Sequence, residues 1–197
     1  MTAPVRDLSS EVAAIIAELG HRPDGAELRR RLELATSDAT AEQIARAAQS
    51  FKDELEVATP LYERLVALQP DNAQALVLLA NAYWLQGRGP HVVGELANRA
   101  IAADPSNRGA WHLWALSESD PRRRVQRWQQ VSARFPADDL ALAAMADNAA
   151  AVAGAEHDYE MVDLAIATYE QLLSRATTAA QREAIETALR ALRGWRF

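Results

Sequence analysis

The chain has 197 residues, a formal net charge of −6 and a hydrophobic fraction of 49%. The acidic balance argues against general binding to nucleic acid or to an anionic membrane, because both need a net basic protein surface. The absence of cysteine excludes disulfides and thiolate metal sites.

Three helices are expected in the first third of the chain. Ser9-Ser10 is expected to cap the first, which ends at Gly20. A turn at 23–25 leads into a second helix with leucines at helical spacing. The third begins near residue 40 and reaches Leu55, and its opening Thr40 and Gln43 fit a capping box.

From residue 60 onward the pattern becomes regular. Pro60 is expected in the first turn of a helix that ends before Pro70. Pro70, Pro105 and Pro136 recur at intervals of 35 and 31 residues, and each separates two stretches with helical apolar spacing. A period of this length is typical of stacked helix pairs.

The C-terminal part is expected to add a pair over 139–173, with Gly154 in its turn, and a last helix over about 179–192 that covers the end of the stack. Two alternatives stay open for the following Trp195 and Phe197. These aromatic side chains either fold back onto the last pair, or dock onto a partner or onto a second copy, which would give a homodimer.

About eleven helices are thus expected, with no strand and no linker, so residues 1–197 are predicted to form a single domain. Residues 1–56 would form its less regular start, 57–175 its repeats and 178–197 its capping helix and tail. Residues 1–20 lack the apolar stretch of a secretory signal, and no run of about 20 apolar residues predicts a membrane span. We therefore expect a cytoplasmic protein.

The central apolar pattern resembles the tetratricopeptide repeat, most clearly over 58–136. The first helix of one repeat matches through Leu76, Leu79, Ala80 and Tyr83, and its second through Val93, Ala97, Ala100, Ile101 and Pro105. The resemblance implies an all-α, right-handed α-solenoid of stacked antiparallel helix pairs. In such an array Tyr83, Trp111 and Trp114 would be buried between helices.

The resemblance also places candidate binding residues, because the first helices of such repeats line a concave groove. The residues expected in the groove are Gln74, Val77, Asn81, Trp84, His112, Leu116 and Asp147. Chaperone-binding members clamp a peptide carboxylate with lysine, arginine and asparagine side chains at these places. Asn81 occupies one such place, but Val77 and His112 stand where basic residues would be expected, and the chain's only lysine is Lys52, which argues against that specificity.

A second candidate is the basic group Arg122, Arg123 and Arg127 at the start of the helix that follows Pro121. These side chains either hold an anion or an acidic partner, or form a solvated face. The four histidines are scattered without metal-ligand spacing, and no phosphate-binding loop or nucleophile motif occurs. No cofactor and no metal site are predicted.

The function predicted from these features is a non-catalytic adaptor or scaffold that binds a peptide or helix of a partner protein in the concave groove. One alternative is a regulatory or assembly subunit of an enzyme or biosynthetic complex. Another is an enzyme whose helices enclose a small-molecule cavity. Neither a nucleic acid nor a membrane is expected as a partner.

Overall fold

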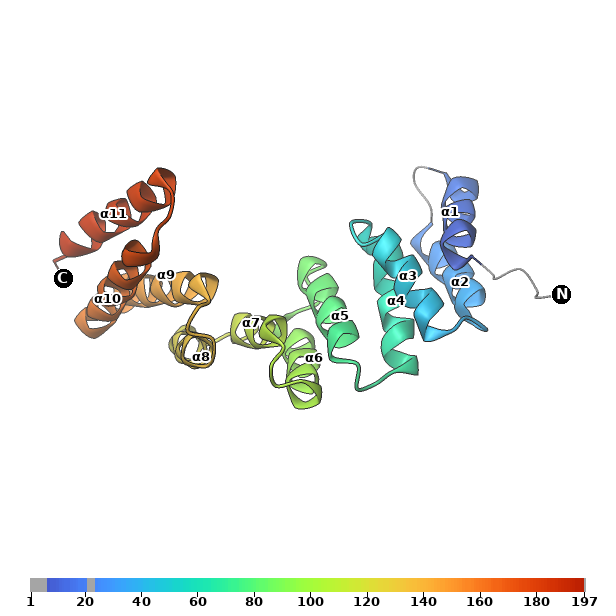
Figure 1. Ribbon diagram of the computed structural model, residues 1–197, viewed down its shortest axis with the longest axis horizontal. Coiled ribbons are helices and arrows are strands. Elements are labelled where there is room, and N and C mark those ends of the chain that lie inside the picture. Colours follow the sequence, from blue (N-terminus) through green and yellow to red (C-terminus); the bar gives the residue numbers. More distant parts are fainter. Residues whose placement is uncertain (1–6, 21–23, 197) are drawn as a thin grey trace. The chain divides into compact units, whose positions relative to one another are not determined.

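The computed structural model describes residues 7–20 and 24–196, and all regular structure in this part of the chain is α-helical (Figure 1). The described helices are α1 (Leu8–Leu19), α2 (Gly25–Thr36), α3 (Ala41–Ser50), α4 (Leu55–Leu68), α5 (Ala73–Leu85), α6 (Pro90–Ala103), α7 (Arg108–Leu116), α8 (Pro121–Arg134), α9 (Asp139–Glu156), α10 (Tyr159–Arg175) and α11 (Ala179–Arg193). The prediction of about eleven helices is confirmed. Part of the turn predicted at 23–25 lies outside the described residues, as does Phe197.

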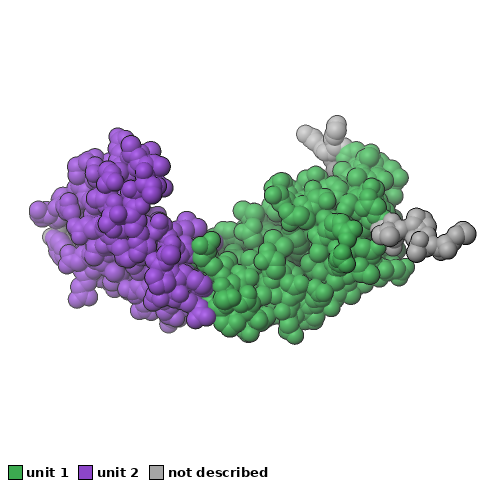
Figure 2. Space-filling view, in the orientation of Figure 1, with its two compact units in different colours: residues 1–113 green, residues 114–197 purple. Residues whose placement is uncertain are grey.

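The backbone contacts group the chain into two compact units, residues 1–113 and 114–197 (Figure 2). Unit 1 includes α1 to α6 and most of α7, and unit 2 includes the end of α7 and α8 to α11. The two units are described separately below. The single domain expected from the sequence stays a prediction.

Unit 1 consists of helix pairs that stack on one another. Within the pairs α1 packs on α2, α3 on α4 and α5 on α6, whereas α1 also contacts α3, α2 contacts α4, and α4 contacts α5. Fully buried alanines allow the helix axes to approach closely. They are Ala47, Ala48, Ala58, Ala80, Ala97 and Ala100. Larger apolar side chains fill the remaining space, among them Leu61, Leu76 and Val93.

Several helix boundaries in unit 1 differ from the expected ones. The Thr40–Gln43 capping box is present, but α1 is capped by Asp7, which accepts a hydrogen bond from the backbone N–H of Ser9. The expected continuation of the third helix to Leu55 is wrong, because α3 ends at Ser50 and α4 begins at Leu55. Consequently Pro60 lies inside α4 rather than in its first turn.

Unit 2 is a stack in which α8 packs on α9, α9 on α10 and α10 on α11. Seven apolar side chains from all four helices form its core cluster. They are Val125, Ala149, Val152, Ala153, Val162, Ala165 and Leu192. Leu189 of α11 is buried as well, so α11 covers α10 through one apolar stripe.

Gly154 does not form the turn in which it was expected. Helix α9 continues through this residue to Glu156, and the chain reverses at His157, whose φ of 56° lies in the left-handed region. A Cβ atom at Gly154 would lie 3.3 Å from the ring of Trp195. The glycine therefore allows an aromatic ring to pack closely against α9, which is a packing role and not a turn.

Trp195 is half-buried and packs against the core cluster of unit 2. Of the two alternatives for the C-terminal aromatic residues, Trp195 thus adopts the one in which the chain folds back on its own last helices. A homodimer stays a prediction, and Phe197 lies outside the described residues.

Candidate functional site

Helix α5 carries most of the predicted groove residues of unit 1. Its N-terminus is fixed by Asn72, whose side chain accepts a hydrogen bond of 3.0 Å from the backbone N–H of Ala75. Residues three and four positions apart share one face of a helix, so the four predicted residues of α5 form a single stripe. In this stripe Gln74, Asn81 and Trp84 are exposed and Val77 is half-buried.

The partial burial of Val77 has a local cause. A Cβ atom at Gly109 would lie 3.2 Å from Cγ1 of Val77, so the first turn of α7 approaches α5 at this point. His112 follows Gly109 by three residues on α7 and is half-buried. The stripe is therefore open at Asn81 and Trp84 and partly covered at Val77.

The end of the stripe exposes two large apolar side chains. Trp84 is 37% exposed and the adjacent Leu85 is 61% exposed. Isolated exposed apolar residues are common on proteins, but a tryptophan beside a leucine at one helix end forms a small apolar patch.

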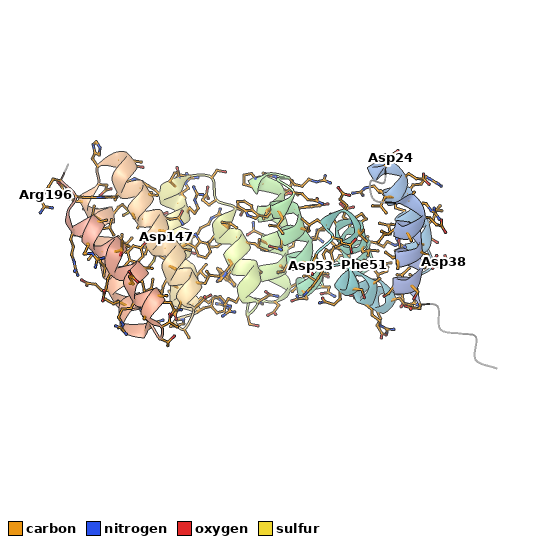
Figure 3. All side chains as sticks on the ribbon, turned by 90° about the horizontal axis from the view of Figure 1, so that it is seen from above. Asp24, Asp38, Phe51, Asp53, Asp147 and Arg196 are labelled. Carbon is orange, nitrogen blue, oxygen red and sulfur yellow. The ribbon has the colours of Figure 1, made fainter. Side chains whose placement is uncertain are left out.

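The two remaining predicted groove residues belong to unit 2. Leu116 is half-buried near the end of α7. Asp147 is exposed on α9 (Figure 3). Its carboxylate accepts a hydrogen bond from the hydroxyl of Tyr169 on α10. Burial and this bond to Asp147 raise the pKa of Tyr169. The structure thus places the four predicted residues of α5 on one face, has His112 on α7 in the same unit, and places Leu116 and Asp147 in unit 2.

The opposite side of α5 faces an open groove that the sequence did not predict. This groove lies between α4 and α6, has a volume of about 860 Å³, and has Leu79 and Tyr83 of α5 among its lining residues. At about 100° per residue, these two side chains point about 150° away from the Gln74–Trp84 stripe. None of the predicted groove residues lines it.

The floor of this groove is apolar and its walls carry charges. Val66, Leu79 and Leu96 are among its apolar lining residues, whereas Glu63 lies on α4 and Glu95 and Arg99 lie on α6. The sequence indicates this groove only through the charged residues next to the apolar stripes of α4 and α6, the second helices of two successive pairs. Such residues are usually solvated surface, and only the packing of α4 and of α6 on α5 places them around one hollow.

Glu63 is the centre of a polar network on the wall of the groove. It accepts two hydrogen bonds from the guanidinium group of Arg29, at 2.6 and 3.3 Å, and one of 2.8 Å from the hydroxyl of Tyr83. Burial alone would raise the pKa of Glu63, but the hydrogen bonds from Arg29 and Tyr83 and the positive charges of Arg29 and Arg88 lower it overall.

Tyr83, which donates to Glu63, is itself half-buried. The prediction that it is buried between helices is therefore wrong. Its hydroxyl reaches Glu63, and the guanidinium group of Arg88 lies 5.2 Å from the centre of its ring. Such polar partners keep the edge of a tyrosine at the surface while its ring covers the apolar interior. Trp111 and Trp114, expected in the core, are likewise half-buried.

The Tyr83–Glu63 bond makes the stability of the protein sensitive to alkaline pH. Burial and the hydrogen bond to Glu63 raise the pKa of Tyr83 to about 12, above the value of about 10 of an unfolded tyrosine. The folded state therefore holds the hydroxyl proton of Tyr83 more tightly than the unfolded state does. The stability that this proton contributes is complete below a pH of about 10 and is lost as the pH rises towards about 12.

We expect Tyr83→Phe to reduce this alkaline loss of stability, measured by denaturation at a series of pH values. Tyr159→Phe, at an exposed ring, is the control. An identical pH profile for Tyr83→Phe and the wild type would contradict this prediction.

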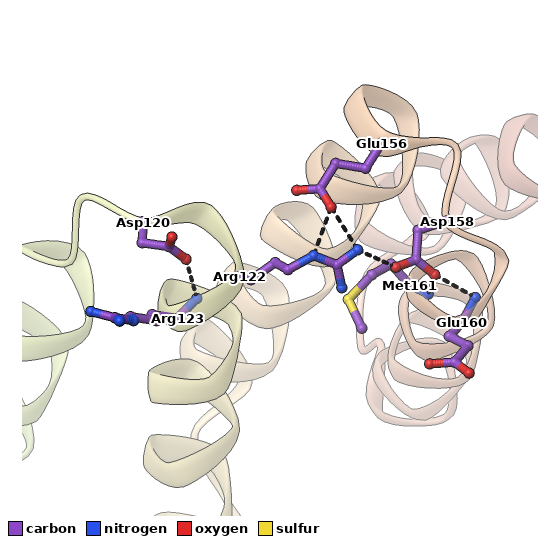
Figure 4. A network of polar contacts seen from close by, with 7 residues as sticks. All are labelled: Asp120, Arg122, Arg123, Glu156, Asp158, Glu160 and Met161. Carbon is purple, nitrogen blue, oxygen red and sulfur yellow. Dashed lines mark hydrogen bonds and ion pairs between the residues drawn. The ribbon is translucent and has the colours of Figure 1, made fainter.

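The predicted basic group lies in unit 2 and interacts with its own chain (Figure 4). Arg122 donates to Glu156, at 2.6 Å, and to Asp158. Asp158 also caps α10 through the backbone N–H groups of Glu160 and Met161. The hydrogen bond from Arg122 lowers the pKa of Asp158. Arg122 thus ties the start of α8 to the connection between α9 and α10.

The other two members of the basic group differ in their surroundings. Arg127 forms an ion pair of 2.8 Å with Glu118, and its guanidinium carbon lies 4.6 Å from the ring centre of Trp114. Arg123 donates its backbone N–H to Asp120, the cap of α8, and the residue is exposed. An acidic partner would have to compete with Glu118, Glu156 and Asp158 for two of the three arginines. The anion-binding role stays a prediction.

In the part of the chain that the structure describes, no three His, Asp or Glu residues are grouped so that they could hold a metal ion. None of the described helices combines the length and the apolarity that are needed to cross a membrane. The cytoplasmic location expected from the sequence stays a prediction.

No family model matches the chain, and no curated protein matches it in sequence. Among solved structures, residues 41 to the end of MamA from Desulfovibrio magneticus RS-1 are 12% identical, with 87% of this chain and 99% of that chain covered and a TM-score of 0.61. A MamA RS-1 ArsTM double mutant is 13% identical over 88% and 99% of the two chains, with a TM-score of 0.60.

The pilF protein of Pseudomonas aeruginosa is also similar in structure. It is 15% identical, covers 95% of this chain and 93% of its own, and gives a TM-score of 0.54. MamA and PilF are tetratricopeptide-repeat proteins, so the chain has an all-α fold of the tetratricopeptide type, as its sequence predicted. At these identities the likeness concerns the fold alone.

Proposed function

We propose that the protein is a non-catalytic interaction module that binds a peptide or helix of a partner protein along the Asn81–Trp84 face of α5. The observation that carries this proposal is the exposure of Trp84 beside Leu85 at the end of a helix whose other large side chains are mostly packed. An indole ring gives a large contact area for little loss of conformational freedom, and tryptophan is enriched where binding energy is concentrated.

The neighbouring residues are consistent with this role. Asn81 is exposed and precedes Trp84 by three residues, so its amide lies on the same face as the indole ring and offers both a donor and an acceptor. Val77 is partly covered by α7 and therefore extends the apolar contact less than the sequence indicated. We assign the anchoring role to Trp84 and the polar contact to Asn81.

The fold supports a binding role without specifying it. Stacked helix pairs present extended surfaces, and folds of this type serve many functions. A regulatory or assembly subunit would use the same kind of surface. The enzyme alternative requires an enclosed small-molecule site, whereas the groove between α4 and α6 is open.

The test is the replacement of Trp84 by Ala. Because the side chain is partly exposed, we expect the melting temperature to remain nearly unchanged while the partner binds more weakly by more than about 1 kcal/mol, as for an interface anchor. The measurement is affinity capture from native lysate with mass spectrometry, followed by calorimetry with the purified partner.

Leu34→Ala is the matched control, since Leu34 is a 61% exposed apolar residue of the same unit on α2. Retention of the partner by the Trp84 variant would contradict the proposal, as would a large loss of stability. A small molecule that copurifies and is turned over would favour the enzyme alternative instead.

A further inference from the structure

The open groove between α4 and α6 offers a second surface, whose residues differ from those of the Asn81–Trp84 face. Val66, Leu79 and Leu96 contribute apolar surface to it, and Val92, which is 37% exposed, lies among its lining residues. Its volume of about 860 Å³ can accept several side chains. An open hollow with an apolar floor and charged walls suits a segment of chain better than an enclosed small molecule.

The wall that carries Glu63 is fixed before any ligand arrives. Arg29 from α2 and Tyr83 from α5 both donate to the Glu63 carboxylate, so three helices hold it in place. A wall that is already ordered loses little conformational freedom on binding, which favours affinity. Because Arg29 balances the charge of Glu63, this carboxylate contributes little net charge to the groove.

The charges that remain available are Glu95 and Arg99, and they differ in sign. The side chain of Glu95 is 65% exposed, and its described ionic neighbour is His91 at 3.8 Å, a weak contact. Arg99 lies one helical turn further along α6, about 6 Å away along the axis. It donates to the backbone carbonyl of Pro70 at the end of α4. The groove therefore has an acidic end near Glu95 and a basic end near Arg99.

We propose that this groove binds an amphipathic helix of a partner protein that places an apolar side chain against Val66, Leu79 and Leu96. A basic side chain of the partner would face Glu95, and an acidic side chain about one helical turn from it would face Arg99, because Glu95 and Arg99 are themselves one turn apart on α6. The argument rests on charge complementarity, since opposite charges at the two ends select a segment that carries both signs. It is independent of the Trp84 face.

The probes are three synthetic helical peptides that share one leucine-containing sequence and differ only at the two positions flanking the central leucine. One carries a basic and an acidic residue there, the second two basic residues and the third two acidic residues. Binding to the full chain is measured by fluorescence polarisation. We expect the peptide with both signs to bind at least about tenfold more tightly than the other two, a difference of about 1.4 kcal/mol.

Charge reversals in the protein provide the decisive comparison. Glu95→Arg leaves two basic ends, so this variant should prefer the peptide with two acidic residues. Arg99→Glu leaves two acidic ends and should prefer the peptide with two basic residues. Both side chains are at the surface, and circular dichroism checks that each variant keeps its helical content. Trp84→Ala should bind the three peptides as the wild type does, which separates this site from the proposed function.

Three results would overturn the proposal. The first is equal affinity of the wild type for all three peptides, or no binding up to millimolar concentration. The second is an unchanged peptide preference in both reversal variants. The third is loss of peptide binding in Trp84→Ala with unchanged binding in the reversal variants, which would place the peptides on the other face of α5.

Discussion

Replacing Trp128 by Ala should lower the free energy of unfolding by about 3–5 kcal/mol, the usual range for removing a large buried aromatic side chain. Trp128 is 4% exposed and lies between Val125 and Val131 on the buried stripe of α8. This helix packs on α9, whose facing residues include fully buried alanines. Small neighbours cannot extend into the space that the indole ring would leave, so a cavity would remain.

Trp84→Ala is the matched control for this measurement because it deletes the same side chain from a partly exposed position. Urea denaturation followed by far-UV circular dichroism should show a large fall of the midpoint for Trp128→Ala and little change for Trp84→Ala. Similar midpoints for the two variants would mean that the burial difference between the two tryptophans is wrong. The same Trp84 variant then serves in the binding experiment.

Replacing Leu61 by Ala should cost about 2–5 kcal/mol, the range for a fully buried leucine. Leu61 is 0% exposed in the middle of α4. That helix contacts α2, α3 and α5, so it is held by three neighbours and cannot move to fill the space that the substitution leaves. We expect the loss to appear as a lower denaturation midpoint with an unchanged slope, because the folded state keeps its compactness.

Leu68→Ala provides the control on the same helix, since Leu68 is 40% exposed near the C-terminal end of α4. The change in composition is identical, and helix propensity favours alanine slightly in both cases. The two variants therefore differ in burial and cavity formation. A cost at Leu68 as large as that at Leu61 would contradict the packing of α4 described here.

The two faces of α5 show why the predicted site is only part of what the structure offers. Helical periodicity places Asn81 and Trp84 on one face, and the structure leaves both exposed. The sequence also assigned Tyr83 to the interior, because the tetratricopeptide pattern has a tyrosine at that place. Its actual position depends on Glu63 of α4 and, through Glu63, on Arg29 of α2. A pattern within one helix pair contains no information about partners that are 20 and 34 residues apart.

The sequence by itself determined the helices, because apolar spacing, capping residues and proline act within a few residues. The Thr40–Gln43 capping box forms as expected, and α4, α6 and α8 each end two residues before Pro70, Pro105 or Pro136. Only the tertiary structure decided what each side chain meets. Pro60 remains inside α4 although its ring provides no N–H group for the helix. Gly154 lies inside α9, where its lack of a side chain leaves room for the ring of Trp195. The groove around Glu63, Glu95 and Arg99 exists because α4 and α6 both pack on α5. These contacts join residues far apart in the chain, so no local pattern specifies them.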